Sequence, residues 1–191
     1  ALYKSSYFPW SHILTGTQGE NPQYDALQIM CDICKENNLK IHAWINPYRV
    51  SSNETPKKLS DNNPYIKNSE IGIKTDNGIF LDPSNEAAQQ LICDGVKEIA
   101  ENYDVDGIQF DDYFYPSTDP ALDAAQYAGV RDVDLAAWRR DNVTRLVKSA
   151  HDAVKAADPT LRFGVSPQGN PDNDLNQQYS DISSWLTLSG E

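Results

Sequence analysis

"VDGIQFDDYFYP", residues 105–116, begins as a short apolar strand and ends in two adjacent aspartates followed by three aromatic residues. It is one of three predicted strands, and a stretch with helical spacing of apolar residues precedes each of them. The predicted helices and the strands that follow them are 24–38 with 39–50, 84–102 with 105–112, and 134–157 with 161–167. Helices that alternate with short strands are typical of a parallel α/β sheet.

The connections between these elements are unequal in length. Only a few residues lead from each helix into the next strand, whereas residues 47–83, 112–133 and 167–178 separate the strands from the helices that follow. Asn77-Gly78, inside the first of these loops, predicts a two-residue hairpin turn. Long loops after the strands favour a (β/α)8 TIM barrel, whose functional sites are built from those loops. A doubly wound sheet is the alternative.

Three strands cannot close a barrel, because a complete one takes roughly 250 residues. We therefore expect residues 1–191 to form a single partial TIM-barrel domain with about three parallel strands and their helices. A last helix is expected within residues 179–191. Open edges of a parallel sheet can pair with another chain, so self-association is also expected.

Composition limits the partners. The net charge of −12 repels phosphate backbones, which argues against nucleic acid and favours a neutral or weakly charged substrate. No run of apolar residues reaches the roughly 18 that a membrane span needs. Cys31 and Cys34 have the spacing of a zinc or redox motif, but with Leu27 and Met30 they repeat at helical spacing, which indicates core packing. Cys93 is interpreted in the same way, and neither a metal nor a cofactor is expected.

The alternate positions of the three strands differ in polarity. Side chains in a strand point to opposite faces in turn, so one set can pack on the helices while the other faces the barrel axis. The apolar set is Ile41, Ala43, Ile45, Ile108, Phe110, Phe163 and Val165. The axis-facing set is His42, Trp44, Asn46, Gln109, Asp111 and Ser166. These polar groups form either a hydrogen-bonded polar core or a binding site.

The last polar residue of each strand supports the second interpretation. Asn46, Asp111 and Ser166 stand at or near the carboxyl ends of their strands, where a barrel has its chemistry. Asp112 has the opposite parity and is either a second functional carboxylate or a residue that orders the loop. Tyr113 and the aromatics after it either stack on a sugar face or pack within the loop.

Five stretches resemble the glycosyl-hydrolase-like 10 family. They are "ALYKSSYFPWSHILTGTQG" (1–19), "IHAWINPYRV" (41–50), "VDGIQFDDYFYP" (105–116), "WRRDNVTRLV" (138–147) and "FGVSPQGN" (163–170). The resemblance covers nearly the whole chain in the family's order. It implies a bacterial (β/α)8-barrel protein that acts on cell-wall or other extracellular glycans, with this chain holding strands three to five. Some members are thought to cut peptidoglycan strands that have lost their peptides.

The resemblance also implies roles for individual residues. Asp111 and Asp112 would be the catalytic carboxylates, and Asn46, Tyr48 and Arg49 would line the substrate groove. Where many members have "SPFG", this chain has Ser166-Pro167-Gln168-Gly169, so Gln168 brings a polar group instead of a stacking aromatic. The expected substrate is a polysaccharide. The implied location is extracellular, periplasmic or at the cell surface, with a lipoprotein anchor as one option.

Two other functions are compatible with the same residues. A metal-dependent hydrolase could use His42, Asp111 and Asp112, although the chain has no HxH or HExxH motif. A glycan-binding protein without catalysis could use the same aromatic and polar groups. Arg49 could clamp the lactyl carboxylate of a muramic acid residue, or it could form an ion pair that orders the long loop.

Overall fold

The computed structural model describes residues 1–187, and its centre is a parallel sheet with the order β1-β5-β6. The strands are β1 (His42–Ile45), β5 (Gly107–Phe110) and β6 (Arg162–Val165). Their register places Trp44 beside Gln109 and Gln109 beside Gly164, so the three strands end level with one another. The expected α/β fold with parallel strands is confirmed.

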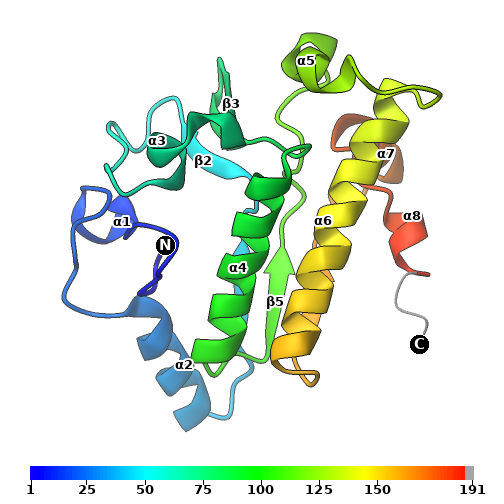
Figure 1. The fold of residues 1–191 in the computed structure, drawn as a ribbon. Coiled ribbons are helices and arrows are strands. Elements are labelled where there is room, and N and C mark those ends of the chain that lie inside the picture. Colours follow the sequence, from blue (N-terminus) through cyan, green and yellow to red (C-terminus); the bar gives the residue numbers. More distant parts are fainter. Residues whose placement is uncertain (188–191) are drawn as a thin grey trace.

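Two long helices, α4 (Glu86–Asn102) and α6 (Leu135–Ala157), lie side by side along this sheet (Figure 1). Each begins at a residue whose side chain accepts a hydrogen bond from the first turn, Asn85 for α4 and Asp134 for α6. Their buried side chains recur every three or four residues and meet the apolar set of the strands. Ile108 and Phe110 of the central strand are fully buried in this core.

A second, antiparallel sheet lies within the long connection between β1 and α4. Its strands β2 (Arg49–Ser52), β3 (Gly72–Thr75) and β4 (Gly78–Leu81) have the order β2-β4-β3. A two-residue hairpin turn is present, but its two residues are Asp76 and Asn77, one position before the predicted Asn77-Gly78, because Gly78 already pairs with Thr75. Gly78 has φ +134, and a Cβ there would lie 2.1 Å from the carbonyl oxygen of Ser51.

The stretch 39–50, expected to be one strand, is two, which corrects that prediction. β1 ends at Ile45 and β2 begins at Arg49. Pro47 lacks the N–H that a continued ladder would need, and Asn46 Oδ1 accepts a hydrogen bond of 2.9 Å from the Arg49 N–H. This local turn redirects the chain from one sheet into the other.

The remaining helices are short except for α2 (Ala26–Glu36), which confirms the first predicted helix. The short ones are α1 (His12–Thr15), α3 (Pro64–Lys67), the 3-10 helices η1 (Ser69–Ile71) and η2 (Pro120–Asp123), α5 (Ala124–Tyr127), α7 (Pro171–Gln177) and α8 (Ile182–Trp185). The helix expected within residues 179–191 is present as α8, and residues 188–191 of that stretch lie outside the described residues. Within residues 1–187, no helix combines the length and apolar character that crossing a membrane requires.

The three cysteines are free thiols. Cys31 of α2 and Cys93 of α4 are buried in the core, as their helical spacing indicated, and Cys34 is half-buried.

Candidate active site

Asp111 follows β5 directly and lies where the three parallel strands end. Its N–H donates to the carbonyl oxygen of Ile45 (3.1 Å), and the N–H of Ser166 donates to the carbonyl oxygen of Phe110 (2.9 Å). These bonds continue the ladder by one residue, so Asn46, Asp111 and Ser166 stand in one row. Asn46 and Asp111 are in contact, with 3.1 Å between Asn46 Nδ2 and Asp111 Oδ2.

Asp111 is 7% exposed as a whole residue, and its carboxylate has a second donor, the N–H of Tyr113, 3.3 Å from Oδ1. Burial raises the pKa of Asp111 above its ordinary value. Tyr113, Asn46, the indole of Trp44 and the positive charge of Arg49 favour the ionised form and oppose the rise, without cancelling it. The carboxylate is therefore oriented by hydrogen bonds and only partly desolvated, and its oxygens keep lone pairs for a ligand.

The face of the sheet opposite α4 and α6 carries the polar set. The side chains of His42 and Trp44 are exposed there, Trp44 at 70%, and Gln109 and Ser166 are half-buried. In contrast, Ala43, Ile108 and Phe110 of the other parity are buried. The alternation therefore separates a covered apolar face from an accessible polar face that ends at Asp111.

The other predicted site residues differ in their exposure and in their hydrogen-bond partners. Arg49 is exposed, and no ion pair of its guanidinium is found within residues 1–187. Asp112 is half-buried after the strand has ended, and its carbonyl oxygen accepts a hydrogen bond from Phe114. Gln168 is exposed, and its N–H donates to Asp174 Oδ1 (3.2 Å). In the described part of the chain, neither Ser166 nor Gln168 bonds to the Asp111 side chain.

The aromatic residues divide into exposed and buried ones. Tyr113 is 58% exposed beside Asp111, whereas Phe114 and Tyr115 are buried. Tyr48 is fully buried, with its ring edge-on to Phe114 at a centroid distance of 6.3 Å. Burial holds the pKa of the Tyr48 hydroxyl well above its ordinary value. Tyr48 therefore lies beneath the site instead of on its open surface, and Trp44 and Tyr113 are the aromatics that a ligand could reach.

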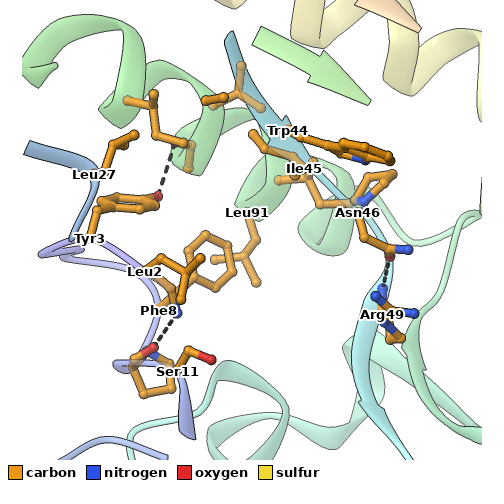
Figure 2. A pocket seen from close by; sticks show the side chains of 18 of the residues that line it. Leu2, Tyr3, Phe8, Ser11, Leu27, Trp44, Ile45, Asn46, Arg49 and Leu91 are labelled. Atoms are coloured by element: carbon orange, nitrogen blue, oxygen red, sulfur yellow. Dashed lines mark hydrogen bonds between the residues drawn. The ribbon is translucent and has the colours of Figure 1, made fainter. Parts of the chain in front are cut away.

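An apolar cavity of about 660 Å³ borders this region without including Asp111 or Asp112. Leu2 and Phe8 of the N-terminal segment lie on one side of it, Leu91 of α4 lines it, and Trp44, Asn46 and Arg49 lie on the other side (Figure 2). Most of its lining is hydrocarbon, which offers few partners for sugar hydroxyls. The polar face that ends at Asp111 is the better candidate for a glycan site.

The described residues include no cluster of side chains suited to bind a metal ion. Within residues 1–187, no group of three or more His, Cys, Asp or Glu side chains is placed to hold a metal ion. His42 and Asp111 have the same strand parity, but they lie at opposite ends of the sheet. His42 is the first residue of β1, whereas Asp111 follows the last residue of β5.

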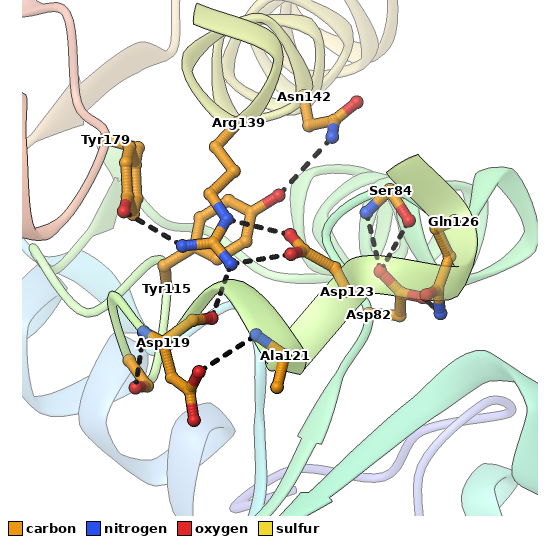
Figure 3. A network of polar contacts seen from close by, with 11 residues as sticks. Asp82, Ser84, Tyr115, Asp119, Ala121, Asp123, Gln126, Arg139, Asn142 and Tyr179 are labelled. Atoms are coloured by element: carbon orange, nitrogen blue, oxygen red, sulfur yellow. Dashed lines mark hydrogen bonds and ion pairs between the residues drawn. The ribbon is translucent and has the colours of Figure 1, made fainter. Parts of the chain in front are cut away.

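Two polar clusters, each centred on a buried charged side chain, were not anticipated (Figure 3). Asp82, which follows β4, accepts hydrogen bonds from Ser84 Oγ (2.7 Å) and Gln126 Nε2 (2.8 Å). Arg139 of α6 is fully buried and paired with Asp123. The sequence contains a signal for Arg139, because it stands four residues before buried Val143, in the same helical stripe as the core residues.

Two bacterial proteins named glycosyl hydrolases are similar in sequence to this chain. The chain is 40% identical over 176 residues to the glycosyl hydrolase YngK of Bacillus subtilis, covering 88% of this chain and 34% of YngK. It is 38% identical over 213 residues to the glycosyl hydrolase DigH of Escherichia coli K12, covering 97% of this chain and 48% of DigH. The chain thus spans between a third and a half of these relatives.

The fold is similar to parts of larger enzymes of known structure. An α-L-fucosidase from Paenibacillus thiaminolyticus matches with a TM-score of 0.57 and 14% identity over 87% of this chain and 25% of its own. A cycloalternan-forming enzyme from Listeria monocytogenes matches with a TM-score of 0.51 and 16% identity over 86% of this chain and 16% of its own. The family model described as Glycosyl hydrolase-like 10 matches residues 1–189, so the chain belongs to the glycosyl hydrolase-like 10 family.

Proposed function

We propose that the protein is a glycoside hydrolase and that Asp111 is its nucleophile or general base. The observation that carries this proposal is the placement of Asp111: a partly desolvated carboxylate, oriented by Asn46 and Tyr113, at the carboxyl edge of a parallel sheet. Family membership and relatives named glycosyl hydrolases support it. Most glycoside hydrolases use a carboxyl group as nucleophile or base on one side of the scissile bond.

The usual mechanism of glycoside hydrolysis also requires a second carboxyl group. Asp112 is the nearest candidate in sequence, but it lies in the bend after β5, where strand parity no longer fixes its side chain relative to Asp111. The partner of Asp111 is therefore either Asp112, after rearrangement of the loop that follows β5, or a residue outside this chain.

A partial (β/α)8 barrel is the architecture that best accommodates this site. The sheet is parallel, its helices cover one face, and its site lies at the carboxyl ends of the strands. β1 and β6 are the edge strands of this sheet. Residues 1–191 alone should therefore self-associate through these edges, and a strictly monomeric species in light scattering would count against open edges.

The proposed substrate class is a bacterial cell-wall or extracellular glycan, and more narrowly peptidoglycan strands without peptides. Arg49 supports this choice, because its exposed guanidinium lies near enough to Asp111 to lower the pKa of that carboxyl. It could hold the lactyl carboxylate of a muramic acid residue, while Trp44 and Tyr113 supply sugar-stacking faces. Such a substrate implies an extracellular, periplasmic or cell-surface location.

Turnover of peptide-free glycan strands by Asp111→Asn in the full-length protein tests the function. The variant should lose at least about a hundredfold in kcat/KM, since removal of a catalytic carboxylate is typically this costly. Asp76→Asn, the same change in the exposed hairpin turn, should keep full turnover. If Asp111→Asn is as active as Asp76→Asn, Asp111 is not the catalytic group. Binding without any product in the wild type would instead indicate a glycan-binding protein.

A second experiment tests the proposed substrate class by comparing the binding of two glycans. Arg49→Ala should weaken binding of muramic-acid-containing glycan and leave binding of neutral chitooligosaccharides nearly unchanged. An equal loss for both ligands, or no loss for either, would contradict a carboxylate clamp at Arg49.

A further inference from the structure

Arg139 is a buried cation that holds two loops at once (Figure 3). Its Nε and Nη2 donate to the two carboxylate oxygens of Asp123 at 2.9 and 2.6 Å, and Nη2 also donates to the carbonyl oxygen of Asp119 at 2.8 Å. Both acceptors belong to the loop after β5. Nη1 donates to the hydroxyl of Tyr179 at 2.9 Å, and Tyr179 belongs to the segment after β6.

Two aromatic rings enclose the same guanidinium. Its central carbon lies 5.2 Å from the ring centroid of Tyr115 and 5.1 Å from that of Tyr179, and the two rings meet edge-on at 5.0 Å. Cation–π contacts of this kind strengthen when they are shielded from water. Tyr115 comes from the loop after β5, like Asp119 and Asp123. Among residues 1–187, the hydrogen bonds and ring contacts of the guanidinium therefore involve only this loop and the segment after β6 that holds Tyr179.

The backbone of Tyr179 shows that this position is constrained. Its φ is +57°, a left-handed conformation that is unfavourable for a bulky side chain. Its ring is 5% exposed and its hydroxyl is held by Arg139. A residue keeps such a conformation only when its surroundings stabilise it, and the cluster around Arg139 does so.

The loop after β5 carries this anchoring to the candidate active site. Phe114 packs edge-on between Tyr48 and Trp185, at centroid distances of 6.3 and 5.9 Å. Tyr115, next in sequence, is held by Arg139 and by Nδ2 of Asn142. Tyr113, one residue before Phe114, thereby has its N–H directed at Asp111.

We propose that Arg139 is a positioning residue that couples the loop after β5 to the segment after β6 and so fixes Tyr113 against Asp111. The coupling stands on the contacts alone, while its importance for catalysis rests on the proposed function of Asp111. Arg139 itself faces no substrate, because it is fully buried under the loops.

Amide hydrogen exchange, measured in variants of the full-length protein, tests the coupling. Tyr179→Phe keeps the ring but removes the hydroxyl that accepts from Arg139, so the fold should persist. Amide exchange should then rise about five- to tenfold in residues 112–123, which lie in the other loop, because one lost hydrogen bond changes an opening equilibrium by about this factor. Arg139→Lys, which cannot make the two-pronged contact with Asp123, should increase exchange in both loops.

Arg140→Lys is the matched control, since it changes the same residue type one position along α6, where the side chain is only partly buried. It should leave exchange in both loops at the wild-type rate. Faster exchange confined to the segment around residue 179 in Tyr179→Phe would overturn the coupling. So would equally faster exchange in every core helix, because that pattern reports global destabilisation.

A titration of the Asp111 carboxyl carbon by NMR tests the link to the site. Loss of the Tyr113 N–H from the carboxylate should raise the pKa of Asp111 in Tyr179→Phe and not in Arg140→Lys, while Arg49 and the neighbouring Asp112 are unchanged in both. An Asp111 pKa identical in all three proteins would overturn the positioning role. Both readouts are independent of turnover, so a protein with coupled loops and no hydrolase activity would contradict the proposed function and leave the coupling intact.

Discussion

Asn46 and Asp111 are 65 residues apart in the chain, and yet the Asn46 amide donates a hydrogen bond of 3.1 Å to the Asp111 carboxylate. The contact exists because β1 and β5 are neighbours in a parallel sheet and end at the same level. Asn46 also accepts from the N–H of Arg49, which begins β2. One amide side chain thus connects the candidate catalytic carboxylate to the second sheet and to the cation beside it.

Asn46→Ala should raise the pKa of Asp111. The Asn46 amide stabilises the ionised carboxylate, so its removal favours the protonated form. If Asp111 acts ionised, the acidic limb of the kcat/KM profile should move to higher pH. Carboxyl-carbon NMR and the pH profile measure the two effects separately, and an unchanged or lower pKa would contradict the interaction.

Asp111→Asn should make the protein more stable at neutral pH, even though the proposed function predicts that it loses turnover. The folded-state pKa of Asp111 is raised above its unfolded value, so ionised Asp111 destabilises the fold at neutral pH. That cost disappears below the unfolded pKa, where the carboxyl is protonated in both states. Urea unfolding should therefore show a gain for the variant at pH 7 that shrinks as the pH falls through the carboxyl range. A gain that grows on acidification would have the wrong sign.

The two faces of the parallel sheet should respond differently to truncation. Phe110→Ala removes a fully buried ring that packs on Phe163 and should cost about 3–5 kcal/mol of unfolding free energy. Trp44→Ala, on the exposed face, should change stability by about 0.5 kcal/mol or less. It should nevertheless weaken glycan binding about tenfold, as expected for an aromatic contact residue.

Tyr24→Ala is the control for Trp44, because Tyr24 is also an exposed aromatic but precedes α2. Calorimetric titration should find its glycan affinity unchanged. Equal affinity losses in Trp44→Ala and Tyr24→Ala would remove Trp44 from the binding face.

Gly78→Ala should destabilise the second sheet. Residue 78 has a positive φ, and a methyl group there would collide with the backbone of Ser51 on β2. A cost of at least about 1 kcal/mol is expected in thermal or urea unfolding. Gly129→Ala, where the added Cβ meets nothing within 4 Å, should lie near the wild type. Equal stability of the two variants would show that β2 and β4 separate easily at this point.

Periodicity along the chain was sufficient to predict the three main helices, the three parallel strands and the row of Asn46, Asp111 and Ser166. These features depend on local spacing and on the rule that parallel strands end together. The second sheet was anticipated only at its hairpin, because β2 and β4 pair although residues 53–77 lie between them in the chain. The burial of Tyr48 and the pairing of Arg139 with Asp123 also depend on contacts between distant segments, and so propensity alone does not reveal them.

The most direct test of the central claim is a crystal structure of the full-length Asp111→Asn protein with a bound glycan oligosaccharide. If Asp111 is nucleophile or base, the substituted side chain at position 111 should lie roughly 3–3.5 Å from the anomeric carbon, or from a water poised to attack it. Trp44 and Tyr113 should contact the sugar faces. A glycan whose scissile bond lies well away from residue 111, for example in the apolar cavity beside Leu91, would contradict the claim.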